Sequence, residues 1–312
     1  MRILLTGANG QLGHELRGSL AALGEVTCAT RDGHLAADGS SCEIANLDRP
    51  SELGGLLERL APDVVVNAAA YTAVDRAEQE PEAAFRINAE AVGALAAACA
   101  ARDALLVHYS TDYVFPGDDP RPRREEDPTG PVNVYGASKL AGEEAIRASG
   151  CRHLIFRISW VYAGHGHNFL RTMLRLSGER DELRIVDDQI GAPTPAHWIA
   201  GATTRAIATA TGSGNGQTDS SQRSGTWHLT PSGETSWHGF AEAIFEESHR
   251  NGLIRRRPAV IPVSTAAYPT PARRPGCSCL DSSKLERDFK IALGHWRQGL
   301  SATLSALPRQ PG

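Results

Sequence analysis

The chain contains 312 residues with a formal net charge of −4, and its 41% apolar and 22% charged residues are typical of a globular protein that buries a large core. The mild acidity argues against a nucleic-acid partner, and the longest apolar run, Val64 to Ala70, is far shorter than the roughly 20 residues of a membrane span. No secretory leader follows Met1 and the six cysteines are scattered, so we expect a cytoplasmic protein without nucleic-acid or membrane partners.

The first half of the chain alternates strands with helices. Continuous runs of valine, isoleucine and leucine predict strands over residues 2–6, 25–30, 63–67, 104–110 and 153–159, because strands covered on both faces are apolar throughout. Helical periodicity predicts helices over 10–23, 51–60, about 82–101 and 135–149. This alternation predicts an α/β fold with a doubly wound parallel sheet of the Rossmann type.

Three glycines, Gly7, Gly10 and Gly13, lie between the first strand and the first helix. Glycine lets the backbone turn tightly and approach a pyrophosphate, which then lies at the amino end of the helix. This placement favours a dinucleotide-binding turn over a merely structural one.

The end of the second strand bears on which dinucleotide is bound. Arg31 could meet the 2′-phosphate of NADPH, whereas an acid at this place would bind the ribose hydroxyls of NADH. Because Asp32 follows directly, we expect NADPH with NADH as the alternative. A solvated loop arginine is the other interpretation of Arg31.

Two further segments have alternative interpretations. Asn67 to Ala70 ends the third strand with small side chains, which leave room for a ligand but also simply pack against helices. Asn88 lies between apolar residues of the long predicted helix. It could fix an active-site loop or lie at the surface.

Tyr135 and Lys139 stand four residues apart at the start of a helix and so share one face. An ammonium group there would lower the pKa of the phenol, so that Tyr135 could donate a proton near neutral pH, and Lys139 could also hold the nicotinamide ribose. Thr111, at the end of the fourth strand, could stabilise the developing alkoxide of a carbonyl substrate. Only three of the 32 basic residues are lysines, and about 0.06 such Tyr/Lys pairs are expected by chance. The sequence therefore predicts a carbonyl reductase site.

The pattern changes after about residue 160. Helices are predicted over 168–177, 195–211, 237–249 and 281–289, between loops rich in proline and glycine. We expect residues 1–160 to form an NAD(P)-binding domain and residues 161–312 mostly a smaller substrate-binding annex, with parts that return to the main sheet. The polar segment 212–225 is predicted to be a flexible surface loop.

Metal chemistry is not predicted. Cys277-x-Cys279 has the wrong spacing for a zinc knuckle, and His165-x-His167 lies in a glycine-rich loop typical of solvent exposure. Neither HExxH nor a GxSxG nucleophile turn is present.

With these residues in place, the chain resembles the extended short-chain dehydrogenase/reductases, and among them the reductases of nucleotide-linked 4-ketosugars. The resemblance covers nearly the whole chain. It rests on segments that begin at Asn67, Ser110, Asn133, Arg157, Asp187 and Pro271: NAAAYTAVD, STDYVF, NVYGASK, RISWVY, DDQIGAPT and PARRP.

The resemblance implies a role for each of these residues. Tyr135 would be the proton donor, Lys139 would hold the cofactor ribose, and Thr111 would polarise the C4 ketone of a dTDP-linked sugar. The implied cofactor contacts are Gly10, Gln11, Leu12, Asn46, Leu47, Ala68, Ala69, Ala70, Tyr109, Tyr135 and Lys139. The motifs described above add Gly7 and Arg31 to this set. The implied substrate contacts are Thr111, Asp112, Trp160, Arg273 and Arg274. Asn46 departs from the family, where aspartate is frequent.

The implied reaction is the last step of a dTDP-deoxysugar pathway for surface polysaccharide. Some relatives dimerise through magnesium held by glutamates, and Glu15 is compatible with this; a homodimer is therefore possible, whereas a need for magnesium stays open. Two alternatives also stay open: another nucleotide-sugar reductase or epimerase of the same fold, or a non-catalytic regulatory subunit. The intact set of Thr111, Tyr135 and Lys139 argues against the regulatory subunit.

Overall fold

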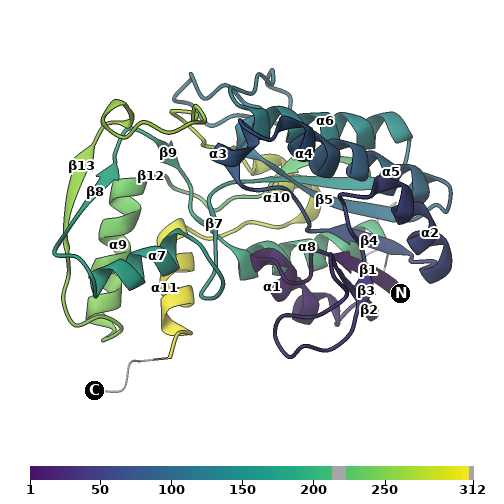
Figure 1. Cartoon of the computed structure of the whole chain (residues 1–312), viewed down its shortest axis with the longest axis horizontal. Coiled ribbons are helices and arrows are strands. Elements are labelled where there is room, and N and C mark those ends of the chain that lie inside the picture. Colours follow the sequence, from purple (N-terminus) through teal and green to yellow (C-terminus); the bar gives the residue numbers. More distant parts are fainter. Residues whose placement is uncertain (213–222, 309–312) are drawn as a thin grey trace.

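Seven parallel strands form the central sheet in the part of the chain that the computed structural model describes, residues 1–212 and 223–308 (Figure 1). Their order is β11-β6-β5-β4-β1-β2-β3. The strands are β1 (Arg2–Thr6), β2 (Glu25–Thr30), β3 (Glu43–Ile44), β4 (Val64–Asn67), β5 (Leu105–Thr111), β6 (His153–Ile158) and β11 (Gly225–His228). The predicted doubly wound sheet is confirmed, and β3 and β11, which were not predicted, form its two edges.

Helices cover both faces of this sheet. The helices α2 (Pro50–Leu60), α5 (Ala91–Ala100) and α6 (Val134–Ser149) pack on one face, and α1 (Gln11–Leu20), α8 (Ala196–Ala210) and α10 (Ser283–Phe289) pack on the other. Successive side chains of a strand point to opposite faces, so Ile3 and Leu5 join one core while Leu4 joins the other. Burial on both faces is the reason why the strands are continuous apolar runs.

The winding of the sheet reverses between β1 and β4. The sheet continues from β1 through β2 and β3 in one direction, and from β4 through β5 and β6 in the other. At such a reversal the connections leave toward opposite faces, so a crevice opens outside the carboxyl ends of the two strands.

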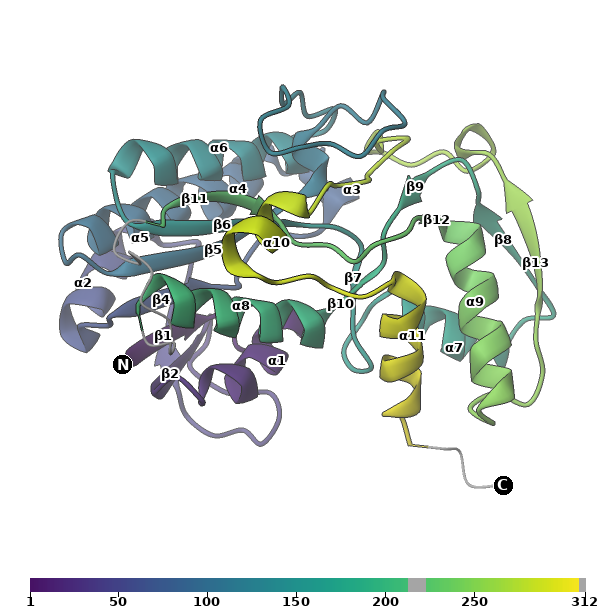
Figure 2. The same ribbon diagram turned by 180° about the vertical axis from the view of Figure 1, so that it is seen from behind.

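Beyond the carboxyl edge of the sheet lies a smaller layer with an aromatic core of its own (Figure 2). It contains α7 (Phe169–Ser177), α9 (Trp237–Arg250) and α11 (Trp296–Ser305). Three strand pairs border it: β7 (Val161–Tyr162) with β10 (Thr194–Pro195), β9 (Ile190–Gly191) with β12 (Thr235–Ser236), and β8 (Glu182–Val186) with β13 (Ala259–Val263). The same half of the chain also sends α8, β11 and α10 back to the main sheet.

The segment predicted as one helix over 82–101 is interrupted. It consists of α4 (Pro81–Phe85), a π-helical turn (Arg86–Glu90) and α5. Pro81–Ala100 is the one helical stretch in the described residues with the length and composition of a membrane span, but the apolar side of α5 packs into the core with α2.

Most other predicted elements lie close to their expected bounds. The helices α3 (Val74–Ala77) and α11 and the 3₁₀ turns at Asp112–Val114 and Thr265–Ala267 were not predicted. The loop predicted over 212–225 lies mostly outside the described residues, and its last residue, Gly225, begins β11.

Candidate active site

A cleft of about 950 Å³ opens at the carboxyl ends of the central strands, where the winding of the sheet reverses. Sixteen of the predicted site residues line it: Gly7, Gly10, Gln11, Leu12, Arg31, Asn46, Leu47, Ala68, Ala69, Ala70, Tyr109, Thr111, Asp112, Tyr135, Lys139 and Trp160. The two that do not line it are Arg273 and Arg274. Segments from both halves of the chain therefore form one cleft.

The glycine turn after β1 packs closely against neighbouring backbone atoms. Gly7 has a φ of +73°, and a Cβ there would lie 2.6 Å from the backbone nitrogen of Ala69. A Cβ on Gly13 would lie 2.1 Å from the carbonyl oxygen of Gly7. The helix α1 begins at the cleft without an acidic first turn or a side-chain cap. Its amino end therefore fits a phosphate group.

Arg31 and Asp32 differ in what their side chains contact. The Asp32 carboxylate accepts hydrogen bonds from the Thr30 hydroxyl at 3.0 Å and from the His34 backbone N–H at 3.4 Å, and these bonds lower its pKa. Arg31 is exposed at the cleft and pairs with no carboxylate in the described residues. Asp32 is thus engaged within its own loop, while the Arg31 guanidinium remains available to a phosphate.

Asn46 forms a local turn at the cleft wall. Its Oδ1 accepts a hydrogen bond from the backbone N–H of Asp48 at 3.1 Å, and Leu47 is buried in the core beside α2. An aspartate at this position, as the resemblance implies for many relatives, could accept the same bond but would add one negative charge to the cleft.

Lys139 is buried and its amine points at a histidine. Its Nζ lies 3.1 Å from Nε2 of His108 on β5. Burial lowers the pKa of Lys139 to about 8, opposed by the carboxylate of Glu143. Burial and the neighbouring Lys139 hold the pKa of His108 well below its ordinary value, so this imidazole is neutral. His108 was not predicted, although a histidine in the buried run LLVHYST is a visible polar exception.

The pKa of Tyr135 is raised, which is opposite to the predicted direction. Burial raises it first, and the nearby carboxylate of Asp112 adds to the shift. The prediction was wrong because it gave Lys139 a charge facing the phenol, whereas the Lys139 amine contacts His108. A raised pKa keeps the phenol protonated at neutral pH, and a proton donor requires that state.

The Thr111 hydroxyl lies between the backbone N–H of Tyr113 and the carboxylate of Asp112. It donates to Oδ1 of Asp112 at 2.9 Å and accepts from the backbone N–H of Tyr113 at 3.2 Å. Burial raises the pKa of Asp112 to about 6, although the hydroxyls of Ser278 and Thr111 oppose the shift. The ring of Tyr113 meets that of Tyr135 edge-on at 5.8 Å, so it helps to position the phenol.

Two stacked tryptophans form the far wall of the cleft. The rings of Trp160 and Trp237 are 3.6 Å apart and nearly parallel, at 8°. Trp160 has a left-handed φ of +46°, and a Cβ on Gly191 would lie 2.5 Å from its ring. A bulky residue in this conformation requires support from its surroundings. Trp237 was not predicted, because it follows an ordinary helix cap, Ser236, which carries no sign of a site.

Arg274 joins two distant segments. Its guanidinium forms two hydrogen bonds to the Asp75 carboxylate, at 2.8 and 3.0 Å, which ties residues 270–275 to the segment after β4. The Arg273 side chain is exposed, and its carbonyl oxygen accepts from Asn133 at 2.8 Å. The predicted contact of both arginines with a diphosphate remains a prediction.

Asn88 fixes the loop after β4. Its Oδ1 accepts from the backbone N–H of Tyr71 at 2.9 Å, and its Nδ2 donates to the Tyr71 carbonyl and to the Ser138 hydroxyl, both at 3.0 Å. Asn88 is fully buried, so its predicted role in fixing a loop is confirmed and the surface alternative is wrong. Asn88 lies within the π-helical turn Arg86–Glu90, and such turns are frequent at functional sites.

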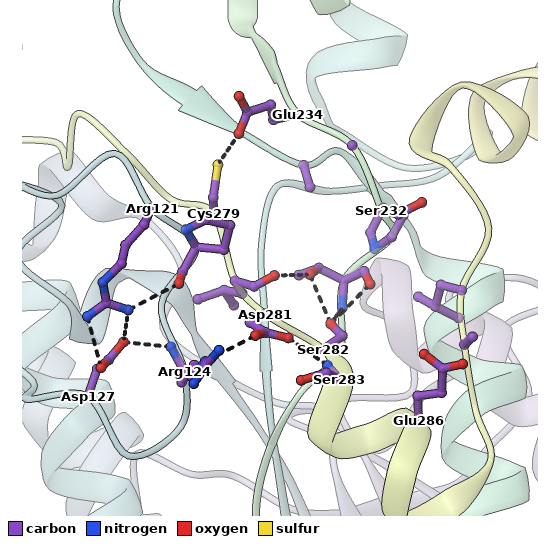
Figure 3. Close-up of a pocket in the computed structure, with 18 residues that line it drawn as sticks. Arg121, Arg124, Asp127, Ser232, Glu234, Cys279, Asp281, Ser282, Ser283 and Glu286 are labelled. Atoms are coloured by element: carbon purple, nitrogen blue, oxygen red, sulfur yellow. Dashed lines mark hydrogen bonds and ion pairs between the residues drawn. The ribbon is translucent and has the colours of Figure 1, made fainter.

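A second cavity of about 900 Å³ contains two ion pairs among the residues that line it (Figure 3). Arg121 meets Asp127, Arg124 meets Asp281, and the thiol of Cys279 lies against Glu234. Across the described residues, no three histidine, cysteine or acidic side chains are placed to hold a metal. Away from this cavity, the His165 ring is 2.7 Å from the Glu15 carboxylate.

Comparisons with known proteins agree with this geometry. The model of the RmlD substrate binding domain matches residues 1–308. The dTDP-4-dehydrorhamnose reductase of Burkholderia thailandensis is 48% identical, with 99% of this chain and 100% of that protein covered. The enzyme of the same name from Escherichia coli K12 is 44% identical, with 98% of each chain covered. A crystal structure of dTDP-4-dehydrorhamnose reductase from Bacillus anthracis in complex with NADP superposes with a TM-score of 0.86 at 32% identity, over 98% of this chain and 99% of that one.

Fold, cleft and relatives together define an NAD(P)-dependent oxidoreductase of the extended short-chain dehydrogenase/reductase class. Within that class the chain belongs to the RmlD family, the dTDP-4-dehydrorhamnose reductases.

Proposed function

We propose that this protein reduces the C4 ketone of dTDP-4-dehydro-L-rhamnose to dTDP-L-rhamnose, with NADPH as the preferred cofactor. The observation that carries the proposal is the meeting of Thr111, Tyr135 and Lys139 with the glycine turn in one cleft. The names of the relatives supply the identity of the sugar.

The cleft fits a dinucleotide. The crowding at Gly7 and Gly13 would not admit side chains, and the uncapped amino end of α1 suits a pyrophosphate. NADPH, when bound, supplies the hydride that C4 accepts. Ala68 to Ala70 would line the path of the cofactor, and Lys139 would hold its ribose hydroxyls.

The residues of the chain supply orientation and the proton. The protonated Tyr135 gives its phenolic proton to the C4 oxygen as negative charge develops there. For the Thr111 hydroxyl to donate to the same oxygen, it has to leave the Asp112 carboxylate that it now contacts. The stacked Trp160 and Trp237 offer a flat apolar wall for the sugar or the base.

The direct test follows NADPH oxidation with dTDP-4-dehydrorhamnose as substrate. We expect turnover with this sugar and little with GDP- or UDP-linked ketosugars. Turnover with another ketosugar alone would identify a different reductase of this fold, and a lack of turnover with all of them would favour a regulatory subunit.

The preference for NADPH is attributed to Arg31. A charge-assisted bond to the 2′-phosphate contributes about 1.5–3 kcal/mol, so Arg31→Ala should raise the KM for NADPH by tenfold or more. The KM for NADH should hardly change. Arg49→Ala, an exposed arginine paired with Glu52, is the matched control. Equal losses with both cofactors would contradict the assignment.

The proposal places the reaction in a reducing compartment, the cytoplasm, where its product feeds the synthesis of surface polysaccharide. All six cysteines are free thiols, which suits such a compartment. We propose no nucleic-acid or membrane partner. Size-exclusion chromatography with and without a chelator tests whether the protein forms a homodimer and whether that dimer depends on magnesium.

A further inference from the structure

Three polar side chains lie in register across β1, β4 and β5, at the last residues of β1 and β4 and at the middle of β5. Thr6 pairs with Asn67, and Asn67 pairs with His108. All three are buried, with exposed fractions of 0%, 1% and 0%. The row ends at Lys139 of α6, whose Nζ is 3.1 Å from Nε2 of His108. Buried polar groups are stable only when donors meet acceptors, so the position of each proton in this row can be derived.

The backbone sets the direction of these hydrogen bonds. The N–H of Ala69 can only donate, and it points at Oδ1 of Asn67 at 3.2 Å. The Thr6 hydroxyl donates to the same oxygen at 2.7 Å. The Nδ2 amide group of Asn67, which can only donate, therefore faces Nδ1 of His108 at 3.2 Å. Because Nδ1 has to accept, the neutral ring of His108 carries its proton on Nε2.

We infer that His108 donates its Nε2 proton to the amine of Lys139, and that the row of Thr6, Asn67 and His108 thereby favours the uncharged form of Lys139 in the protein by itself. An ammonium group has three donors and no acceptor, so it would face the Nε2–H donor to donor. His108 is thus a positioning residue that acts through Lys139.

The charged surroundings of Lys139 agree with this assignment. It faces the neutral His108 from β5, and its titratable neighbours on α6 are Tyr135 and Glu143. Glu143 is itself neutralised by Arg157 of β6, through bonds of 2.7 and 2.8 Å. Asp112, in the turn after β5, acts on Tyr135. Burial lowers the pKa of Lys139 to about 8, which brings the uncharged amine within reach of neutral pH.

The inference rests on the proposed placement of Lys139 at the cofactor ribose. When the amine turns from His108 to ribose hydroxyls, it can donate all its protons, so cofactor binding should take up a proton. The charge then lies beside Tyr135 and lowers the pKa of its phenol. In this structure, burial and the Asp112 carboxylate raise the pKa of Tyr135. The proton donor would thus be tuned only while the cofactor is bound.

The first test measures the tautomer of His108 in the protein without cofactor. The full chain is labelled with ¹⁵N-histidine, and its imidazole resonances are recorded between pH 6 and 9. We expect a protonated Nε2 and a bare Nδ1 with no titration in this range. The His108→Gln variant assigns the resonances. A proton on Nδ1, or a ring that becomes doubly protonated, would overturn the inference.

The second test measures proton uptake by calorimetry of NADP⁺ binding at pH 8, in two buffers of different ionisation enthalpy. With the pKa of Lys139 at about 8, we expect an uptake of about half a proton per NADP⁺. Asn67→Asp places an acceptor opposite Nδ1, so the tautomer should reverse and the uptake should fall to near zero. Unchanged uptake in this variant would contradict the inference.

The matched control is His153→Gln on β6. This buried histidine hydrogen-bonds to the carbonyl oxygen of Cys151 at 2.8 Å. It lies at the amino end of β6, the strand next to β5, and so far from the cleft at the carboxyl ends. It should keep the wild-type uptake. If Asn67→Asp does not fold, the inference is judged by two measurements on the wild type alone: the tautomer of His108 and the proton uptake on NADP⁺ binding. Binding of NADP⁺ without uptake would refute this inference and leave the proposed function standing, whereas failure of NADP⁺ to bind would refute the proposed function.

Discussion

Tyr135 shows how burial controls chemistry at the scale of a single residue. Its phenol is partly buried in the cleft wall and lies close to the Asp112 carboxylate, and both effects keep it protonated. In the proposed mechanism the proton is therefore present at neutral pH, and it leaves Tyr135 as charge develops on the substrate oxygen. The neighbouring Thr111 and Lys139 hydrogen-bond in this structure to Asp112 and His108. Their proposed roles therefore require both side chains to exchange partners during turnover.

Replacing Tyr135 should separate proton donation from binding. Tyr135→Phe keeps the ring and removes the proton, so we expect turnover to fall by about 100-fold or more while the Kd for NADPH changes little. Steady-state kinetics and a fluorescence titration measure the two quantities. Tyr268→Phe, at an exposed tyrosine, is the control. Wild-type turnover of Tyr135→Phe would show that another group donates the proton.

The raised pKa of Asp112 should make stability depend on pH. Its pKa is about 6 when folded and its ordinary value is 3.8, so the folded state binds this proton more tightly and stability is lost as the pH rises through 4 to 6. For this group alone the free energy of unfolding should fall by about 2 kcal/mol between pH 4 and 7. Asp112→Asn should remove that part of the dependence in urea unfolding curves. Identical pH profiles of variant and wild type would show that the shift is absent.

At the scale of elements, the turn from β1 into α1 depends on close backbone approach. Gly7 and Gly13 leave no room for Cβ atoms, whereas Gly18 on the same helix has nothing within 4 Å of the equivalent position. The two glycines of α1, Gly13 and Gly18, therefore differ in what they contribute, although both are the same residue type.

Two alanine variants test this difference. Gly13→Ala forces α1 away from the turn, so we expect the affinity for NADPH to fall by tenfold or more and stability to fall by about 1–3 kcal/mol. Gly18→Ala should leave affinity unchanged and raise stability by up to about 1 kcal/mol, because alanine is the better helix former. Thermal unfolding and cofactor titration measure both effects. Similar results for the two variants would argue against crowding at Gly13.

At the scale of the whole molecule, the cleft depends on contacts between remote segments. Asp75 and Arg274 are 199 residues apart in the sequence, and their ion pair joins residues 270–275 to the segment after β4. The stacked tryptophans likewise bring the segment after β6 against α9. These contacts place the annex over the carboxyl edge of the main sheet.

Loss of the Asp75–Arg274 pair should affect the sugar nucleotide more than the cofactor. Arg274→Gln frees residues 270–275, so we expect the KM for the dTDP-sugar to rise about tenfold, a cost of about 1.4 kcal/mol, with little change in the Kd for NADPH. Because the pair is partly exposed, stability should change by less than about 1 kcal/mol. Asp75→Asn should have the same effect, and Arg250→Gln in a surface pair with Glu246 should have none. If the rise in KM of the Asp75→Asn/Arg274→Gln double variant equals the product of the two single rises, the two residues act separately.

The sequence by itself determined the sheet, the glycine turn and the Tyr135/Lys139 pair. Each of these is written in local periodicity or spacing: apolar runs mark strands buried on both faces, and four residues bring two side chains to one face of a helix. Only the tertiary structure decided four other features of the site. They are the raised pKa of Tyr135, the buried row from Thr6 to His108, the stacked rings of Trp160 and Trp237, and the ion pair between Asp75 and Arg274. Their partners are far apart in the chain, and their energies depend on burial, which no local pattern specifies.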